Sequence, residues 1–496
     1  MTERVPGERV RSANQAPVRR DGRYVLVWMI AARRTSFNFA LDRAAEWARA
    51  LRRPILVLEP LRCAYPWASD RLHSFVLQGM ADNARAFADA GVTYHPYVEP
   101  SPGAGRGLLA ALASEASVVV TDDFPAFFLP RMVAAAGARL PVRLEVVDGN
   151  GLLPLRTATA VFPTAYAFRR FLQRELPDRL RPFPSSSPLE RAGLAGAPLP
   201  EAVARAWPAA SGAMLAADPA TLGALPIDHS VPPVQETRGG SSPAREALSS
   251  FVSDRMGRYL ERSQPDVEAS SGLSPWLHFG AISAHEVFRA VARREGWKAS
   301  KLGTERRGRK EGFWGMSVEA EAFLDELVTW RELGFNMLSL RPAAAASFET
   351  LPPWAIRTLE AHASDRRDPV YDRATLERAG THDEVWNAAQ SQLLREGRIH
   401  NYLRMLWGKK ILEWTASPRE ALRVMLELND RWALDGRDPN SASGIFWCLG
   451  RYDRPWGPER PVFGTVRYMS SANTRRKLRL TEYLRRHGPG AQGTLL

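Results

Sequence analysis

The chain has 496 residues, of which 45% are apolar and 24% are charged, a composition typical of a globular protein with two or three domains. Its 67 basic and 54 acidic residues leave a net charge of +13, which favours a polyanionic partner such as nucleic acid. The two cysteines, Cys63 and Cys448, exclude a disulfide framework, a four-cysteine zinc site and a cubane iron–sulfur cluster.

Other classes of protein are disfavoured by what the sequence lacks. No window approaches the roughly 18 uninterrupted apolar residues that a membrane-spanning helix needs. The first twenty residues are polar and contain arginines, so they do not resemble a secretory signal. The histidines show neither HExxH nor a zinc-ligand spacing, and we therefore predict no metal. A cytoplasmic location without a membrane partner is the expectation.

The amino-terminal part predicts an α/β domain over residues 23–155, preceded by a disordered segment 1–22. Short apolar runs alternate here with amphipathic, helix-like segments such as FALDRAAEWARAL. The runs are YVLVWMI, PILVLEP, TYHPYV, SVVVTDD and VRLEVVD. This alternation predicts a doubly wound, parallel, five-stranded sheet. No GxGxxG follows the first run, which argues against dinucleotide binding of the usual Rossmann kind.

The remaining chain divides into a connector and an all-helical domain. Residues 156–245 are rich in proline, glycine and serine, as a long surface connector would be. Residues 246–488 have helical patterns with frequent start signals. Capping boxes are expected at Thr381 with Glu384, Ser417 with Glu420, and Ser283 with Glu286. Pro275 and Pro418 occupy expected first helical positions, and Gly397 is an expected helix end.

The segment SSGLSPWLHFG, residues 270–280, is the first candidate binding element. It combines hydroxyl groups, a glycine and an expected helix start at Pro275. Free N–H groups at a helix start attract phosphate or pyrophosphate. Taken alone, however, the segment fits a plain helix cap better.

Two further segments could bind a flat polar ligand. In EAFLDELVTWREL, Glu326 and Trp330 are four residues apart and share a helix face, beside Arg331. In LDGRDPN, an aspartate could pair with Arg404 of the sequence NYLRMLW. A helix with surface ion pairs and a simple turn explain these patterns equally or better when each is taken alone.

The tryptophans of the carboxy-terminal part form the last candidate. Trp407 and Trp414 are seven residues apart, hence on one helix face, with roughly 10 Å of rise between them. Trp386 lies on the preceding expected helix and could pack against them. Spaced indoles can pass an electron through a protein, although packing explains most buried tryptophans.

Jointly, these segments resemble the photolyase/cryptochrome family, and within it the class II cyclobutane pyrimidine dimer photolyases. The matching stretches include SGLSPWLHFG, FLDELVTWREL, IHNYLRMLWGKKILEWTASPREAL, LNDRWALDGRDPN and RPVFGTVRYM. The resemblance spans roughly residues 24 to 480. It implies an α/β domain, a connector, and an all-α domain that holds FAD and repairs dimers in UV-damaged DNA with light.

The resemblance also implies roles for individual residues. Glu326 would be the carboxyl that bonds the dimer carbonyls, and Asn429 would lie near the flavin N5. Trp330, Trp447 and Met405 would contact the flipped-out dimer, and Trp407, Trp386 and Trp414 would form the electron-transfer chain. The flavin-binding set would be Tyr259, Ser270, Ser271, Gly272, Leu273, Ser274, Arg331, Asn401, Arg404, Asn429, Asp435 and Asp438.

Several points stay open at the level of sequence. The family's second, antenna chromophore would be a deazaflavin or a folate, and the segment FPTAYAFRRFL departs from the usual class II sequence of that domain. A blue-light receptor of the cryptochrome type, a (6-4) photoproduct photolyase using His400 and a flavoprotein that does not bind DNA are the alternatives. Few residues follow Lys477 to serve as a receptor's signalling tail. We expect a monomer.

Overall fold

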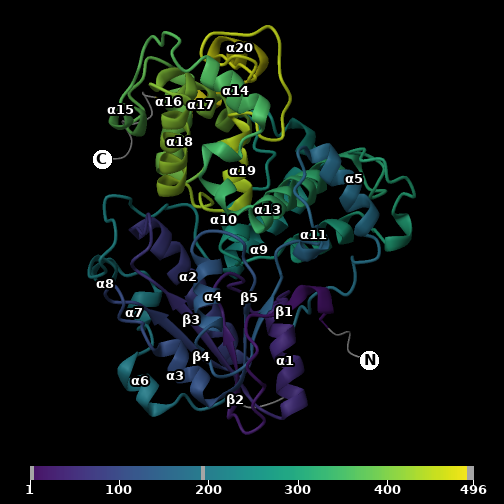
Figure 1. Cartoon of the computed structure of the whole chain (residues 1–496), viewed down its shortest axis with the longest axis vertical. Coiled ribbons are helices and arrows are strands. Elements are labelled where there is room, and N and C mark those ends of the chain that lie inside the picture. The colour runs from purple at the N-terminus through teal and green to yellow at the C-terminus, as the bar shows by residue number, and fades with distance from the viewer. Residues whose placement is uncertain (1–4, 191–195, 489–496) are drawn as a thin grey trace.

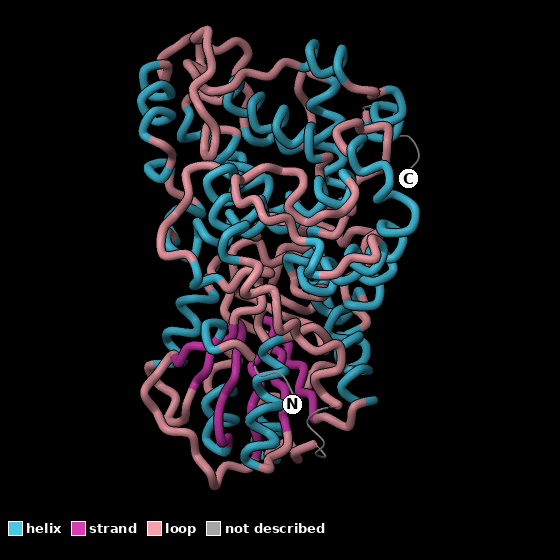
Figure 2. Tube along the Cα trace, turned by 90° about the vertical axis from the view of Figure 1, so that its right-hand side faces the viewer, coloured by secondary structure: helices cyan, strands magenta, loops and turns pink. Residues whose placement is uncertain are grey.

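A computed structural model describes residues 5–190 and 196–488 of the chain. Figure 1 shows an α/β part at one end of the long axis and a helical part at the other. In Figure 2 the strands gather in the lower third of the molecule, while the upper part consists of helices and loops.

The α/β part is built on a six-stranded sheet with the order β1-β6-β5-β2-β3-β4. Its strands are β1 (Val10–Ser12), β2 (Tyr24–Trp28), β3 (Ile55–Leu61), β4 (Thr93–Val98), β5 (Ala116–Asp122) and β6 (Leu144–Val147). Strands β2 to β6 are parallel, and they match the five strands predicted from the sequence. The predicted α/β fold is confirmed, with β1 as an additional antiparallel edge strand.

Four helices wind the sheet on both faces, which explains why β2 and β5 are buried along their whole length. They are α1 (Phe39–Leu51), α2 (Asp70–Asp89), α3 (Leu108–Glu115) and α4 (Leu129–Gly137). Val25 and Val27 of β2 pack with α1, whereas Leu26 and Trp28 pack on the opposite face with α3 and α4. The side-chain alternation of a strand thus supplies both cores.

The prediction that residues 1–22 are disordered is wrong for the part that the structure describes, residues 5–22. Here β1 pairs with β6, from Val10 opposite Val147 to Ser12 opposite Glu145. Arg9 is buried and donates hydrogen bonds to the backbone oxygens of Asp148 and Leu152. A three-residue strand carries too little apolar alternation to be found in the sequence, and long-range pairing overrides local polarity. Residues 1–4 lie outside the described residues.

Within the residues that the structure describes, the connector contains five helices, which follow a 3-10 turn, η2 (Leu155–Thr157). They are α5 (Ala165–Glu175), α6 (Glu201–Ala206), α7 (Gly212–Leu215), α8 (Pro219–Gly223) and α9 (Ser241–Ser250). Helix α9 continues without interruption into η3 (Phe251–Arg255) and η4 (Met256–Glu261), so the chain enters the helical part through it. The domain boundaries predicted from the sequence stay predictions.

The helical part contains α10 (Ser274–His278), α11 (Ala284–Arg294), α12 (Val318–Leu324), η6 (Asp325–Trp330), α13 (Arg331–Leu340), α14 (Pro353–Ala361), α15 (Arg373–Glu377), α16 (Glu384–Glu396), α17 (Asn401–Trp414), α18 (Pro418–Trp432), α19 (Pro439–Trp447), α20 (Ser471–Lys477) and α21 (Thr481–His487). Short 3-10 turns join some of them, namely η5 (Ala299–Lys301), η7 (Pro342–Ala345) and η8 (Phe348–Thr350).

The helix ends mostly follow the expected signals. The Ser283 and Ser417 side chains cap α11 and α18, and α18 begins at Pro418. Helix α16 ends at Gly397 with a left-handed φ of 65°. Two details differ from the prediction. Asp383, not Thr381, caps α16 by accepting from the Trp386 N–H, and α10 begins at Ser274, one residue before Pro275.

A buried arginine joins the two parts of the molecule. Arg71 of α2 donates to the backbone oxygens of Leu393 and Leu394 at the end of α16, and to that of Trp432 at the end of α18. Cations are favourable at helix carboxyl ends, where the last carbonyls lack helical partners. The α/β part therefore fixes the ends of two helices that carry predicted site residues.

Candidate functional site

The helix that carries Glu326 and Trp330 is not regular. Between α12 and α13 the chain forms the π-helical turn η6, Asp325–Trp330, which accommodates one extra residue. The sequence predicted one continuous helix with both side chains on a common face. Hydrophobic periodicity over so few residues does not distinguish a π turn from an α turn. Such turns occur often at functional sites.

Glu326 is half-buried on this turn and contacts one cation. Its Oε1 accepts a hydrogen bond of 3.3 Å from Nη2 of Arg262, whose guanidinium lies 4.8 Å from the centre of the Tyr259 ring. Burial raises the pKa of Glu326, the positive charge of Arg262 opposes this, and the neighbouring Asp325 adds to it. The carboxyl therefore holds its proton more readily than an exposed glutamate.

Trp330 and Trp447 come together although they are far apart in the sequence. Trp330 ends η6, and Trp447 ends α19, a helix that packs against α13. Their indole rings stack with centres 5.1 Å apart and planes inclined by 28°. Met405 is partly buried on α17 and packs against the core of the carboxy-terminal helices. One ring of this aromatic pair, that of Trp330, therefore lies on the turn that also carries Glu326.

Arg404, Asn429 and Asp435 form a polar cluster between α17, α18 and the following turn. Nη1 of Arg404 donates to Asn429 Oδ1 at 3.4 Å, and Nη2 lies 3.5 Å from Asp435 Oδ1. The Asn429 amide donates to the Gly436 oxygen at 2.9 Å and to Ser441 Oγ at 3.1 Å. The orientation of this amide is thereby fixed.

Asp438 and Arg331 lie at the boundary of the two parts. The Asp438 side chain caps α19 and approaches Nδ1 of His278 to 3.4 Å, and contact with His278 holds the pKa of Asp438 down against its burial. Arg331 is buried and donates to the Asn150 oxygen at 2.5 Å. Arg331 therefore binds the α/β part and does not join the Arg404 cluster. Asn401 begins α17 and is exposed.

The loop Ser270–Leu273 lies beside two arginines. Gly272 has a left-handed φ of 70°, and Ser271 Oγ accepts from the Leu273 N–H at 3.4 Å. Nη1 of Arg255 donates to the Ser270 oxygen at 3.1 Å, and its buried Nε has no hydrogen-bond partner among the described residues. Arg398 lowers the pKa of Arg255 further, after burial, because the two cations repel. An anionic group such as a pyrophosphate fits this donor set.

The three tryptophans of the predicted chain are in contact and almost fully buried. The Trp386 and Trp414 rings lie edge to face at 5.6 Å. Trp386 Nε1 donates to the Trp407 oxygen at 3.0 Å, and Trp407 Nε1 donates to Gln390 Oε1 at 2.8 Å. Trp386 therefore lies between the other two, as an electron-transfer chain would require.

A cavity of about 100 Å³ opens where the α/β part meets the helical part. It lies beyond the carboxyl ends of β2 and β5, where the strand order reverses and ligands of doubly wound sheets usually bind. Its aromatic lining includes Tyr65, Phe127 and Phe279, and Arg437 stacks on all three rings at 5.1 to 5.8 Å. The arrangement suits a flat conjugated ligand.

Sequence reasoning missed Arg255 and Arg437, described above, and two further members of the site. Arg262 was not singled out, because only the fold brings it to Glu326, 64 residues away. Ser441, which joins Arg404 to Asn429, follows LDGRDPN directly but has no distinctive neighbours. Among the residues that the structure describes, no group of three or more histidine, cysteine or acidic side chains could hold a metal, and no helix is long and apolar enough to cross a membrane.

The fold defines a class of protein in which a doubly wound α/β part precedes a helical part, and similarity to known proteins identifies the family. The chain is 33% identical to a deoxyribodipyrimidine photo-lyase of Methanothermobacter thermautotrophicus over 97% of its length and 98% of the relative's. It is 32% identical to one of Oryza sativa, covering 93% of the chain and 86% of the relative. The chain belongs to the photolyase family. No family model matches it.

Solved structures agree in fold. A class III photolyase from Agrobacterium tumefaciens superposes with a TM-score of 0.67 at 18% identity, over 94% of this chain and 86% of that one. A cryptochrome of Synechocystis superposes with a TM-score of 0.68 at 15% identity, over 94% and 88%. In both structures, as in this chain, an α/β part is followed by a helical part.

Proposed function

We propose that the chain is a class II photolyase that repairs cyclobutane pyrimidine dimers in UV-damaged DNA. The observation that carries this proposal is the stacked pair of Trp330 and Trp447, of which Trp330 shares its turn with Glu326, a carboxyl with a raised pKa. Indole planes can contact a flipped-out pyrimidine dimer, and a protonated carboxyl can donate to carbonyl oxygens on which negative charge develops.

The chain's own groups fit FAD. Arg255 and the loop Ser270–Leu273 would bind its phosphates, and Arg404, Asn429, Asp435 and Asp438 would surround its ring system. When bound and reduced, FAD supplies an electron on excitation by light and so splits the cyclobutane ring. Asn429 would offer FAD an amide of fixed orientation, since its donors and its acceptor are engaged by Arg404, Gly436 and Ser441. Trp414, Trp386 and Trp407 would pass electrons to the flavin.

The alternatives are less well supported by the residues present. A (6-4) photolyase needs a histidine that can act as an acid, whereas burial lowers the pKa of His400 to about 4 and keeps its ring neutral near pH 7. A light receptor has no need of a dimer-binding pair. The relatives with which the chain aligns over nearly its whole length are named as lyases.

The decisive experiment is light-driven repair by the anaerobically reduced protein. Oligonucleotides with one thymine dimer should regain their undamaged form under near-ultraviolet or blue light and not in darkness. The same strand with a (6-4) lesion should stay unrepaired. Protein that binds flavin and dimer but leaves the dimer intact under light would contradict the enzymatic proposal and favour the receptor.

We propose in addition that the cavity beside Arg437 holds the second chromophore. Its position at the strand-order reversal and its aromatic lining support a flat, conjugated molecule, a deazaflavin or a folate. An absorption spectrum of protein from its native source would show flavin bands and one further band, whose wavelength distinguishes the two classes.

A further inference from the structure

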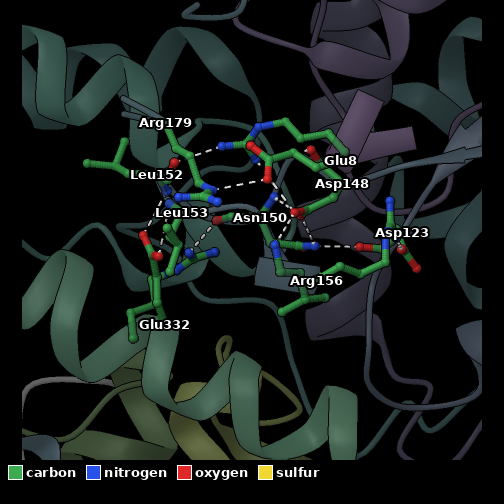
Figure 3. Close-up of polar contacts among 12 residues, drawn as sticks. Glu8, Asp123, Asp148, Asn150, Leu152, Leu153, Arg156, Arg179 and Glu332 are labelled. Carbon is green, nitrogen blue, oxygen red and sulfur yellow. Dashed lines mark hydrogen bonds and ion pairs between the residues drawn. The ribbon is translucent and has the colours of Figure 1, made fainter. Parts of the chain in front are cut away.

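Glu332 is a buried carboxylate that connects the two parts of the molecule. It is the second residue of α13, only two positions after Trp330, and 5% of it is exposed. Its Oε1 accepts from the Leu152 N–H at 2.7 Å and its Oε2 from the Leu153 N–H at 3.2 Å (Figure 3). Both partners belong to the loop that follows β6 in the α/β part.

The loop fits the carboxylate closely. A Cβ atom at Gly151 would lie 2.5 Å from Glu332 Cδ, so only glycine leaves room for it. On its other side the loop accepts hydrogen bonds from Arg9, through the Leu152 oxygen at 2.7 Å, and from Arg331, through the Asn150 oxygen at 2.5 Å. These contacts on both sides fix the position of the loop backbone relative to α13.

The opposite end of the π turn is fixed as well. Asp325, its first residue, forms two hydrogen bonds of 2.6 and 2.9 Å with Arg169 of α5, and both side chains are buried. A π turn is an uncommon conformation that persists when its surroundings determine it. Glu332 and the Arg169–Asp325 pair enclose the segment that presents Glu326 and Trp330.

From this geometry we propose that Glu332 is a positioning residue for dimer recognition, an inference that rests on the proposed repair function. By binding the Leu152 and Leu153 N–H groups, it fixes the rotation and axial position of the π turn. Trp330 then faces Trp447, and Glu326 is presented by the same turn. Glu332 itself touches neither dimer nor flavin.

The test compares dimer recognition in Glu332→Gln with that in the wild-type protein. A glutamine offers one oxygen and one NH2 group to two N–H donors, so one contact becomes repulsive. We expect affinity for dimer-bearing DNA to fall about 10- to 100-fold, the effect of misplacing a binding group by about 1 Å. Affinity for undamaged DNA and flavin photoreduction should stay at wild-type values, since phosphate contacts and the tryptophans lie elsewhere.

Glu321→Gln is the matched control. Glu321 is also buried and accepts only from backbone N–H groups, those of Gly312, of Gly315 at 2.7 Å and of Met316 at 3.2 Å. These contacts lie in the helical part, on α12 before the π turn. We expect Glu321→Gln to destabilise the protein to a similar degree while keeping the ratio of dimer to undamaged affinity. An equal loss of that ratio in both variants would overturn the proposal and indicate general destabilisation.

A substitution on the other side of the contact provides an independent check. Gly151→Ala leaves Glu332 unchanged but displaces it from the loop. It should reproduce the loss of dimer discrimination, and combining it with Glu332→Gln should add little further loss. Unchanged discrimination in both single variants would overturn the positioning role alone. A wild-type protein that does not distinguish dimers from undamaged DNA would instead contradict the proposed function.

Discussion

Glu326 shows how one residue's surroundings set its chemistry. A carboxyl in water is ionised near pH 7 and cannot donate a hydrogen bond, but burial on the π turn raises its pKa above the ordinary 4.5. Arg262 limits that rise and also orients the group. The sequence located this residue correctly in a helix, but neither Arg262 nor the extra residue of the turn could be inferred from local pattern.

We predict that the repair yield of the reduced protein declines as pH rises through the raised pKa of Glu326. The protonated form donates to the dimer, and this form is lost above that pKa. Glu326→Gln keeps an amide donor at every pH, so its profile should be flat and, at the acidic end, about fivefold below wild type, equivalent to roughly 1 kcal/mol for one weakened hydrogen bond. Quantum yields measured from pH 5 to 9 test this.

Glu311→Gln, at an exposed position, should retain the wild-type profile. Parallel profiles for wild type and Glu326→Gln would show that another group titrates. Flavin content and dimer affinity, recorded for each variant, separate a change in yield from a change in binding.

At the scale of elements, the parallel strands and most long helices could be predicted because each has a strong periodic pattern. Helix α1 was predicted within its observed bounds, Phe39–Leu51. Strand β1 and the π turn could not be predicted, since the first depends on pairing with β6 and the second on anchors contributed by α5 and the α/β part. The tryptophan contacts could be anticipated from spacing, but the intermediate position of Trp386 needed the packing of α16 on α17.

The contact of Trp386 with both neighbours leads to a prediction on electron transfer. Trp386→Phe should largely abolish photoreduction of oxidised flavin by an external donor, because the ring between Trp407 and Trp414 is lost as a redox group. Repair by chemically reduced protein should persist. Trp314→Phe, in a separate aromatic cluster with Phe288, is the control for the loss of a buried indole. Equal photoreduction rates in the two variants would exclude Trp386 from the path.

Strand β1 gives a prediction on stability. Arg9→Ala removes a buried guanidinium that lies 3.6 Å from Asp148 Oδ2, and it leaves that carboxylate without its cation. The free energy of unfolding should fall by about 3 kcal/mol. Arg11, on the same strand, is 41% exposed and pairs with Asp123, which keeps Arg156 as a second cation, so Arg11→Ala should cost under about 1 kcal/mol. Urea unfolding measures the loss in free energy for both variants. Equal losses would mean that the buried pair stabilises the protein no more than the Arg11–Asp123 pair does.

At the scale of the whole molecule, the charge of +13 predicts how DNA binding responds to salt. Because arginines and lysines displace counterions from phosphates, affinity for undamaged DNA should fall at least about tenfold between 50 and 200 mM salt. The preference for a dimer should change less, since it depends on stacking and hydrogen bonds within the site. Filter binding or anisotropy at several salt concentrations measures both quantities. An affinity that does not respond to salt would favour a flavoprotein that does not act on DNA.

Composition and the alternation of apolar runs with helix-like segments were sufficient to predict an α/β part and a helical part. The way in which the two parts contact each other could not be predicted from the sequence. The joint depends on single buried groups such as Arg71 and Glu332, whose partners are backbone atoms of distant segments. Backbone partners leave no signature in the sequence. Gly151 would indicate this contact only to a reader who already knew that Glu332 packs against it.

The turn between α18 and α19 serves two compartments at once. Asp435 faces the Arg404 cluster, while Arg437, two residues later, stacks on the aromatic lining of the cavity where the two parts meet. A molecule lodged in that cavity would thus press on the same six-residue stretch of backbone that shapes the neighbouring one. A change of the ligand in one site would therefore require adjustment of the backbone that both sites share. A lineage that changes its light-gathering pigment should carry compensating substitutions in this short stretch.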